Sequence, residues 1–371
     1  MTNSHDTDDE GLVQAFSQAA VLMDVLLEFH TGLSPFGRKL LTYYTLGSHA
    51  LPHAQHFPLA KLRGFFGTGK SSALKVAKLF AYRPFSFSGR GCSFPVFRDN
   101  LELAYQGTAL IEEGDAGWKC DPEPLLSDRY DRTSAQAGHK VPSGEAGFST
   151  RVILYFGATI IHRRVAFADA ALESRCVAVN FRPVHGRTYG EMGADWEAQW
   201  SEAPEVKAIQ DLILDLPPVE QDELIAGRIW NTYTPVIAVA GIVGDSQFEA
   251  ELIQKMEGIT MTLKEAQATA ELDTIAVRAL IECMSKGGTL KIGEGISLKD
   301  IRDTVWKNTS LTASPFQLGT IFGDLGVERR KSHGITKLYA SAAILVKVCT
   351  ELGIDDEAVE ELAKKLKSKN G

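Results

Sequence analysis

The sequence predicts an α/β fold with a parallel β-sheet at its core and helices before and after it. Short β-branched runs alternate with helical stretches between about residues 58 and 182, the pattern of a parallel sheet flanked by helices. Apolar residues recur at helical spacing from Gly11 to about Leu51 and again over residues 190–258. A Gly-rich loop also separates a short apolar strand, Leu59–Arg63, from a helical pattern over Ser72–Phe80.

That loop, residues 64–71, matches the phosphate-binding pattern G-x-x-x-x-G-K-[ST]. In such a loop the backbone N–H groups bind an anion at the amino end of the next helix, the lysine reaches the β- and γ-phosphates, and the hydroxyl ligates Mg²⁺. An ordinary Gly-rich turn is the alternative, and the order of strand, loop and helix argues against it. We therefore expect ATP and Mg²⁺ at a site formed by Gly64, Gly67, Thr68, Gly69, Lys70 and Ser71.

Composition restricts the class of protein. At 371 residues the chain is long enough for two or three domains, and its hydrophobic content of 44% is ordinary for a globular protein. We find no apolar run as long as a membrane span and no signal peptide, so we expect a cytoplasmic protein without membrane contact. The five cysteines contain no C-x-x-C pair, which argues against a zinc site or a disulfide framework. Because the net charge is −8, any DNA contact must come from a local basic patch.

Two acidic residues follow the next apolar strand. The run from Thr108 ends at Glu112 and Glu113, as a hydrolytic site requires: one carboxylate for the Mg²⁺ shell and the next for the attacking water. We assign Glu112 to the metal and Glu113 to the water. Asp is the usual first residue, and the extra methylene of Glu112 puts the rate of hydrolysis in doubt more than binding. A shift in which Asp115 takes part stays open, as does a plain acidic turn.

A further apolar strand, Arg151–Ile161, leads to His162, and the segment Asp-Ala-Ala-Leu-Glu-Ser-Arg follows at residues 169–175. With the loop and the acidic pair, these segments resemble the AAA+ ATPases. The resemblance implies that a polar residue after this strand senses the γ-phosphate; His162 is the candidate and Arg163 the runner-up, with a structural role for His162 equally open. It also implies that Arg175 projects into the ATP site of a neighbouring copy, so that hydrolysis requires a ring. A surface arginine at a helix end is the alternative.

Residues 131–145 lie between the acidic pair and this strand, and their Gly, Pro and alternating residues predict an inserted hairpin or loop. In ring helicases, which the resemblance brings in, such an insert faces the pore and moves DNA. His139 and Lys140 are then the residues expected to contact DNA phosphates. A solvated loop without this role is equally compatible with the pattern.

The helical region after the sheet carries a second resemblance. Residues 227–240, from Gly227 through Arg228 and Trp230 to Ala240, are similar to a segment of AAA+ proteins encoded by phages, plasmids and cassette-type mobile elements, some of them MCM-like replicative helicases. The resemblance covers about residues 20–260. It implies a helical lid in which Arg228 closes on the ATP phosphates, and the alternative is an arginine on a helix surface. The primase and zinc modules that often accompany this family are absent from the sequence.

The C-terminal part predicts a winged helix. A capped helix is expected over residues 297–305, a second with an early proline over residues 314–326, and two strands around a basic turn over residues 327–339. The second helix is poor in Arg, Lys, Asn and Gln, so we expect non-specific DNA contact, with protein docking as the alternative. The residues expected to contact phosphates are Arg329, Arg330, Lys331 and Lys337.

The predicted domains are a disordered segment 1–10, an N-terminal helical region 11–52, an AAA+ core 53–185, a helical lid 186–262, a winged-helix domain 270–348 and a C-terminal helix or tail 349–371. We expect an ATP-hydrolysing ring, a hexamer, that moves on single-stranded or forked DNA as a replicative helicase of a mobile element. One alternative is a nucleotide-dependent scaffold or switch, such as a loader or initiator, that binds DNA or protein without translocating. A small-molecule kinase is the other, since it shares the phosphate loop.

Overall fold

The structure is a computed structural model that describes residues 5–112, 119, 121–143, 147–183, 189–286, 289–309, 313–332, 334–352, 354 and 356–369. The chain divides into two compact units, Met1–Thr260 and Met261–Gly371. The division falls inside α10 (Ser246–Met284), a single helix of 39 residues. The predicted gap between the lid and the C-terminal domain at residues 262–270 is therefore not a break in the helix. Residues 261–272 contain neither Gly nor Pro and are rich in strong helix formers, which explains the continuity.

Among its described residues, the first unit contains a five-stranded parallel sheet with the order β2-β3-β6-β1-β7. The strands are β1 (Leu59–Arg63), β2 (Pro84–Ser88), β3 (Thr108–Glu112), β6 (Ala158–His162) and β7 (Cys176–Asn180). This confirms the predicted α/β class with a parallel sheet. Strand β6 lies between β1 and β3, so the strand before the phosphate loop and the acidic strand are not direct neighbours.

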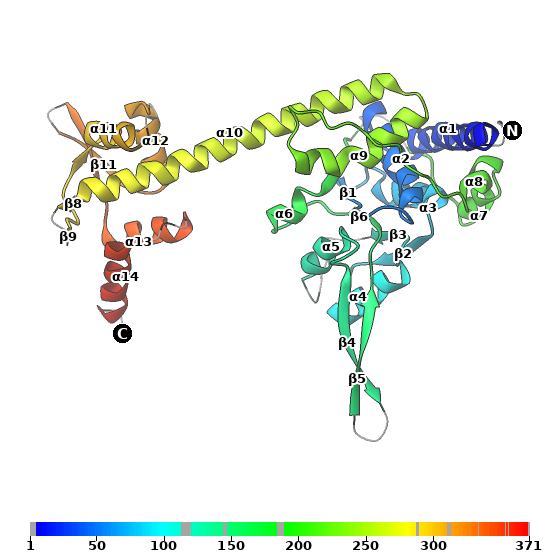
Figure 1. The fold of residues 1–371 in the computed structure, drawn as a ribbon, viewed down its shortest axis with the longest axis horizontal. Coiled ribbons are helices and arrows are strands. Elements are labelled where there is room, and N and C mark those ends of the chain that lie inside the picture. The colour runs from blue at the N-terminus through cyan, green and yellow to red at the C-terminus, as the bar shows by residue number, and fades with distance from the viewer. Residues whose placement is uncertain are drawn as a thin grey trace. The chain divides into compact units, whose positions relative to one another are not determined.

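The helices of the first unit surround this sheet (Figure 1). They are α1 (His5–His30), α2 (Pro35–Gly47), the 3-10 helix η1 (Ser48–Ala50), α3 (Lys70–Phe80), α4 (Phe94–Leu103), α5 (Glu123–Arg129), α6 (Ala170–Glu173), α7 (Trp196–Ser201), α8 (Pro204–Ile209) and α9 (Gly227–Ile242). Helix α1 begins at His5, so the predicted disorder of residues 1–10 is wrong from His5 onward, and residues 1–4 lie outside the described residues. The acidic composition that suggests disorder also favours the amino end of a helix.

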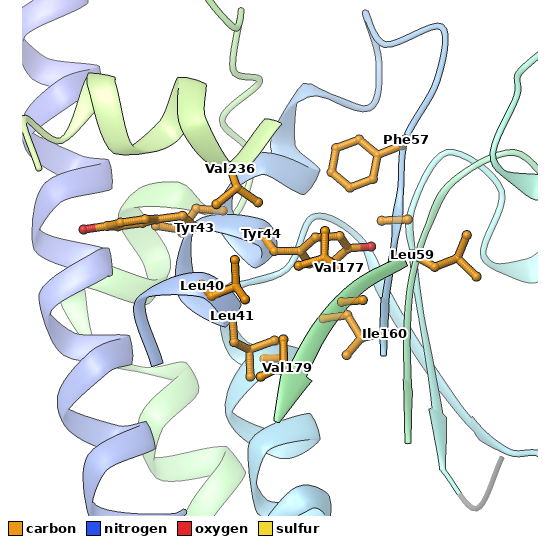
Figure 2. Packing of buried hydrophobic residues seen from close by; sticks show 14 of the residues in the cluster. Leu40, Leu41, Tyr43, Tyr44, Phe57, Leu59, Ile160, Val177, Val179 and Val236 are labelled. Atoms are coloured by element: carbon orange, nitrogen blue, oxygen red, sulfur yellow. The ribbon is translucent and has the colours of Figure 1, made fainter. Parts of the chain in front are cut away.

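Helix α2 packs against the sheet and forms the centre of the core. Figure 2 shows Leu41 and Tyr44 of this helix beside Ile160 of β6 and Val177 and Val179 of β7. The buried Tyr44 hydroxyl lies 2.7 Å from the carbonyl oxygen of Pro58 and 2.9 Å from that of Thr159, so it ties the helix to the sheet. This packing buries the apolar residues that give the N-terminal region its helical spacing.

The predicted strand over Arg151–Ile161 is two strands. Residues up to Leu154 form β5 (Gly147–Leu154), which pairs antiparallel with β4 (Gln136–Ser143), and the sheet strand β6 starts only at Ala158. The break includes Gly157, where a Cβ atom would lie 2.4 Å from the carbonyl oxygen of Gly107. The hairpin or loop predicted over residues 131–145 is a hairpin, but it extends to Leu154 and so includes the first part of the predicted strand; it projects from the sheet as a long ribbon (Figure 1).

Two further differences concern the helical regions. The sequence predicts a helical region over residues 190–258 that is broken at Pro217 and Pro218, and in the structure this break is longer, because residues 210–226 contain no helix. Pro217 and Pro218 lie in this stretch, and each removes a backbone donor and fixes φ. In addition, α1 contains a stretch, Glu10–His30, that is long and apolar enough to cross a membrane by length and composition alone. One face of this stretch, with Phe16, Met23 and Leu27, is fully buried in the core, whereas Val21, Val25 and Phe29 are exposed.

The second unit has its own core around the end of α10. Its further elements are β8 (Ser285–Lys286), β9 (Thr289–Leu290), β10 (Ile296–Ser297), α11 (Leu298–Thr309), α12 (Pro315–Asp324), β11 (Glu328–Ser332), β12 (Ile335–Tyr339), α13 (Ala342–Glu351) and α14 (Glu357–Lys369). Strands β10, β12 and β11 form an antiparallel sheet, and Ile301, Leu318 and Leu338 are buried between helices and sheet. The C-terminal segment, predicted as a helix or tail, contains the helix α14, and Val359 of this helix belongs to the core of the second unit.

Candidate functional site

The phosphate loop lies between β1 and α3, as predicted, and its glycines are required by geometry. Gly67 and Gly69 have φ of +75° and +84°, in the region that favours glycine. A Cβ atom on Gly69 would also lie 2.6 Å from the carbonyl oxygen of His30, and one on Gly64 would lie 2.7 Å from the Cβ of Phe181. The loop therefore packs too closely against its neighbours to accept any side chain at Gly64 or Gly69.

The amino end of α3 is prepared for an anion. Helices α2 and α12 begin with a serine, Ser34 and Ser314, whose side-chain oxygen accepts a backbone N–H of the first turn. Helix α3 begins after Gly69, which has no side chain to do this. Its first-turn N–H groups and the positive end of its dipole thus face the loop, where phosphate oxygens can accept from them.

Lys70 is held inside the loop. Its Nζ donates to the carbonyl oxygen of Phe65 and lies 3.4 Å from Oγ1 of Thr68, and both Lys70 and Thr68 are buried. The Thr68 hydroxyl donates to the same carbonyl oxygen at 2.8 Å, so Thr68 shapes the loop. To reach a phosphate, the Lys70 ammonium has to leave the Phe65 carbonyl. In the structure the ammonium therefore lies inside the loop, near the position expected for phosphate contact but not at it.

Glu112 ends β3 and faces helix α3. It lines a cavity of about 140 Å³ together with Leu74, Lys75, Lys78, Ser86, Leu110 and Glu197. Ser71 begins the stripe of α3 that continues through Lys75 and Lys78, at spacings of four and three residues. Glu112 thus faces the helical stripe that contains the other predicted Mg²⁺ ligand, but it shares the cavity with two lysines. Glu113 and Asp115 lie outside the described residues.

His162 ends β6 between the two strands that carry the loop and the acidic residue. Its register partner on β1 is Leu62, directly before Arg63 and the loop, and the preceding Ile161 pairs with Ile111 of β3. His162 is half-buried at this carboxyl edge of the sheet. The runner-up, Arg163, is engaged elsewhere, because its Nη2 donates to Oε1 of Glu123 at 2.9 Å. The placement favours His162 over Arg163 as the residue that could report on a phosphate.

Arg175 lies at the opposite edge of the sheet. Its carbonyl oxygen accepts from the N–H of Leu59, the first residue of β1, whereas the phosphate loop follows the last. A five-residue strand at about 3.3 Å per residue separates these points by about 13 Å, longer than an arginine side chain. The guanidinium donates to Oγ of Ser127 at 2.7 Å and stacks on the ring of Tyr130 at 5.1 Å. Arg175 therefore cannot reach the phosphate loop of its own chain.

Arg228, at the start of α9, lies beside Arg175 and not beside its own phosphate loop. Its Nη1 is 3.4 Å from Oγ of Ser174, and both arginines act electrostatically on Tyr130. The implied closure of Arg228 on ATP phosphates thus requires the phosphates of another copy. The structure brings together the loop residues, Glu112 and His162 at one edge, and Arg175 with Arg228 at the other.

The predicted DNA-contacting residues are distributed over both units. His139 and Lys140 lie on β4, opposite Arg151 and Thr150 of β5, and the side chains of His139 and Lys140 lie outside the described residues. Arg151 is a basic hairpin residue that the sequence reading does not single out; its side chain is exposed and paired with Glu102 of α4. Arg151 is the first residue of the strand predicted over Arg151–Ile161. Only the break between Leu154 and Ala158 shows that it belongs to the hairpin and not to the central sheet.

In the second unit the basic residues have different surroundings. Arg329 donates to the carbonyl oxygen of Gly319 at 2.6 Å and so attaches the hairpin to α12. Arg330 forms a two-bond pair with Glu328 at 2.6 and 3.0 Å, which compensates its charge. Lys331 is exposed and Lys337 is half-exposed. The two lysines are therefore better placed for phosphate contacts than the two arginines.

The comparisons with known proteins give limited similarity. No protein-family model matches the sequence, and no curated protein resembles it. Among solved structures, one titled "SCCmec type IV Cch - active helicase" is 13% identical, with a TM-score of 0.40, covering 83% of this chain and 68% of that one. A second, "The A form apo structure of NrS-1 C terminal region-CTR(305-718)", is 10% identical, with a TM-score of 0.31, covering 84% and 76%. At these TM-scores the similarity decides nothing about function, which depends on the site itself.

Proposed function

We propose that this chain is an AAA+-type ATPase that assembles head to tail into a ring, hydrolyses ATP between neighbouring copies, and acts on single-stranded or forked DNA as a mobile-element replicative helicase. One observation carries the proposal: the phosphate loop and Arg175 lie at opposite edges of the same sheet. A site that needs both must take them from two copies, and head-to-tail contacts of this kind form a ring when the rotation between copies closes.

Each residue has a role in this reaction. The N–H groups of α3 bind the phosphates, and Lys70 moves from the Phe65 carbonyl to the β- and γ-phosphates. Mg²⁺, which Ser71 and Glu112 would hold, neutralises phosphate charge when it is bound. Glu113 orients the attacking water, and Arg175 of the next copy neutralises the charge that develops on the transferred group. We assign the sensing of the γ-phosphate to His162, whose register partner on β1 is Leu62, and this position near the loop supports the assignment.

The DNA-binding part rests on the two hairpins. We assign a winged helix to the second unit, and the order β10, α11, α12, β11, β12, with the three strands in one antiparallel sheet, supports this assignment. There we assign phosphate contacts to Lys331 and Lys337. In the first unit the β4–β5 hairpin, with His139 and Lys140, is the element we assign to contact with DNA inside the ring.

The test compares Arg175→Ala with the exposed control Arg90→Ala. Loss of an arginine that acts on the transferred phosphoryl group lowers kcat by about 10³-fold or more, while the affinity for a fluorescent ATP analogue is unchanged. The control should match the wild type in both. Mass measurement with ATP and forked DNA should find a ring. Full ATP turnover by single copies, or by the Arg175→Ala variant, would exclude a shared site. Transfer of phosphate from ATP to a small molecule by a monomer would support the kinase alternative.

A nucleotide-dependent switch is the second candidate, and Glu112 favours it. Its side chain is one methylene longer than that of the usual Asp and lines a cavity together with Lys75 and Lys78, two cations beside the place where Mg²⁺ would bind. Such a site binds ATP and hydrolyses it slowly. ATP turnover and strand separation measured on the same forked DNA distinguish the two: a ring that binds DNA and ATP but does not separate strands would be a loader or initiator.

A further inference from the structure

The segment that ends at Arg175 crosses the whole sheet. Residues 163–175 connect β6 to β7, and because the two strands are parallel, the segment must return from the carboxyl edge, where the phosphate loop lies, to the amino edge. It contains α6, only four residues long, and Glu173 is the last residue of that helix. Arg175 follows two residues later, and its N–H donates to the carbonyl oxygen of Leu172 at 3.0 Å. The direction in which Arg175 leaves the chain is therefore set by how α6 is fixed.

A buried lysine fixes α6 to the strand before the phosphate loop. Lys61 of β1 is fully buried, and its ammonium bonds the carboxylate of Glu173. The ring of Phe167 has its centre 5.3 Å from the same ammonium. The backbone N–H of Phe167 donates to the other carboxylate oxygen of Glu173 at 3.0 Å. Burial alone raises the pKa of Glu173, but the bonds from Lys61 and Phe167 bring it below its usual value. A buried ammonium without this partner would be strongly unfavourable, so the contact is specific.

A second ion pair holds the other end of the segment. Arg163, the residue after His162, donates to Glu123 of α5, whose carboxylate also accepts the N–H groups of Ala168 at 3.1 Å and Asp169 at 2.8 Å. Asp169 in turn caps α6 through the N–H of Ala171. The segment is thus tied both to the strand before the phosphate loop and to the residue after the predicted sensor.

We propose that Glu173, held by Lys61, is a positioning residue that sets Arg175 for the ATP site of the next copy. This deepens the proposed function and depends on it. Glu173 acts on the phosphates bound by the neighbouring copy and not on those bound by its own chain. Lys61 connects this residue to the phosphate loop of the same chain, because Lys61 lies on β1, the strand that leads into that loop. Glu173 therefore affects turnover at the neighbour's ATP site and does not only stabilise the fold.

The first test is Glu173→Gln, with Asp245→Asn as the matched control. Asp245 is also a half-buried carboxylate bound to a lysine, Lys39 at 2.5 Å, but it joins α2 to the end of α9. A misplaced catalytic group costs up to about 100-fold, so Glu173→Gln should lower kcat by about 10- to 100-fold with KM and ATP-analogue affinity unchanged. Asp245→Asn should leave kcat within about twofold. An unchanged kcat in Glu173→Gln, or a loss of affinity equal to the loss of rate, would overturn the proposal.

The decisive test mixes two impaired variants. Lys70→Ala copies cannot bind the phosphates but contribute an intact Arg175, whereas Glu173→Gln copies have an intact loop. When the two are mixed in equal amounts, about a quarter of the head-to-tail interfaces pair a Glu173→Gln site with a Lys70→Ala neighbour and should recover full turnover. A mixture no more active than its components would overturn the positioning role.

A parallel mixture of Arg175→Ala with Lys70→Ala separates this proposal from the proposed function. If that mixture recovers and the Glu173→Gln mixture does not, the shared site stands and the positioning role fails; if neither recovers, the shared site itself fails. Should Glu173→Gln not fold, the double variant Lys61→Met with Glu173→Leu replaces the ion pair by apolar side chains, which is often neutral for stability. It should fold and give the same recovery on mixing, and a double variant with wild-type kcat would refute the positioning role.

Discussion

Arg129 gives the sharpest stability prediction, because a fully buried guanidinium joins three parts of the first unit. It lies at the end of α5 and donates to the hydroxyl of Thr159 at 2.9 Å. Its other bonds within the described residues go to backbone carbonyl oxygens of Leu101, Ala104, Gly107, Tyr155 and Ala158. Burial lowers the pKa of Arg129 to about 9, so the charge itself costs stability and these hydrogen bonds offset that cost.

The replacement Arg129→Met keeps the volume and removes every donor. A buried polar group left unsatisfied costs roughly 1–3 kcal/mol, and leaving two or three of these acceptors without a donor gives about 3–5 kcal/mol. That is a large part of the roughly 5–15 kcal/mol that holds a domain folded. Arg132 is the matched control, since it also donates to backbone carbonyl oxygens, at Ala54 and Pro52, but is half-exposed. Water can replace it, so Arg132→Met should cost about 1 kcal/mol.

Hydrogen exchange of β6 amides is the suitable assay, because it reports the first unit without the second. Each 1.4 kcal/mol is tenfold in protection, so Arg129→Met should lower protection by about 10²- to 10⁴-fold and Arg132→Met by less than about tenfold. Equal losses of protection in the two variants would mean that burial of the guanidinium does not determine how much these hydrogen bonds contribute to stability.

Three further predictions concern the loop, acid stability and DNA. Gly69→Ala should abolish binding of an ATP analogue, because its Cβ would meet the His30 carbonyl at 2.6 Å; Gly91→Ala, with φ of +71° but open space around it, should lose only stability. Burial alone raises the pKa of Asp245, but its hydrogen bonds bring it below its ordinary 3.8, so its stabilisation is present above that pH and lost below it. The difference in urea unfolding free energy between wild type and Asp245→Asn should therefore shrink from about pH 5 to about pH 3, and a constant difference would contradict this. Lys337→Ala should weaken DNA binding on all sequences and reduce the slope of log affinity against log salt by about 1, whereas Arg330→Ala, whose guanidinium is already paired, should change it less.

Much of the fold follows from local patterns in the sequence. The phosphate loop is predicted because eight consecutive residues determine it, and the structure places Gly64 to Gly69 between strand and helix, with Lys70 and Ser71 as the first two residues of the helix. The hairpin predicted around the basic turn in the second unit is confirmed, because it too depends on residues that are close together in the sequence. The strand over Arg151–Ile161 is predicted wrongly, because an apolar run does not reveal that Gly157 must approach Gly107 closely. The roles assigned to Glu112, Glu113, His162 and Arg228 stay predictions.

The prediction of a phosphate site at the loop needs the sequence alone, since a nest of N–H groups, a lysine and a hydroxyl are supplied by neighbours along the chain. The edge of the sheet at which each arginine lies follows from the tertiary structure alone, which separates Arg175 from the phosphate loop of its own chain. The tertiary structure also decided that Lys61 meets Glu173 across 112 residues of sequence. The physical reason is that a crossover connection brings distant residues together through packing on the sheet, and no local periodicity encodes that distance.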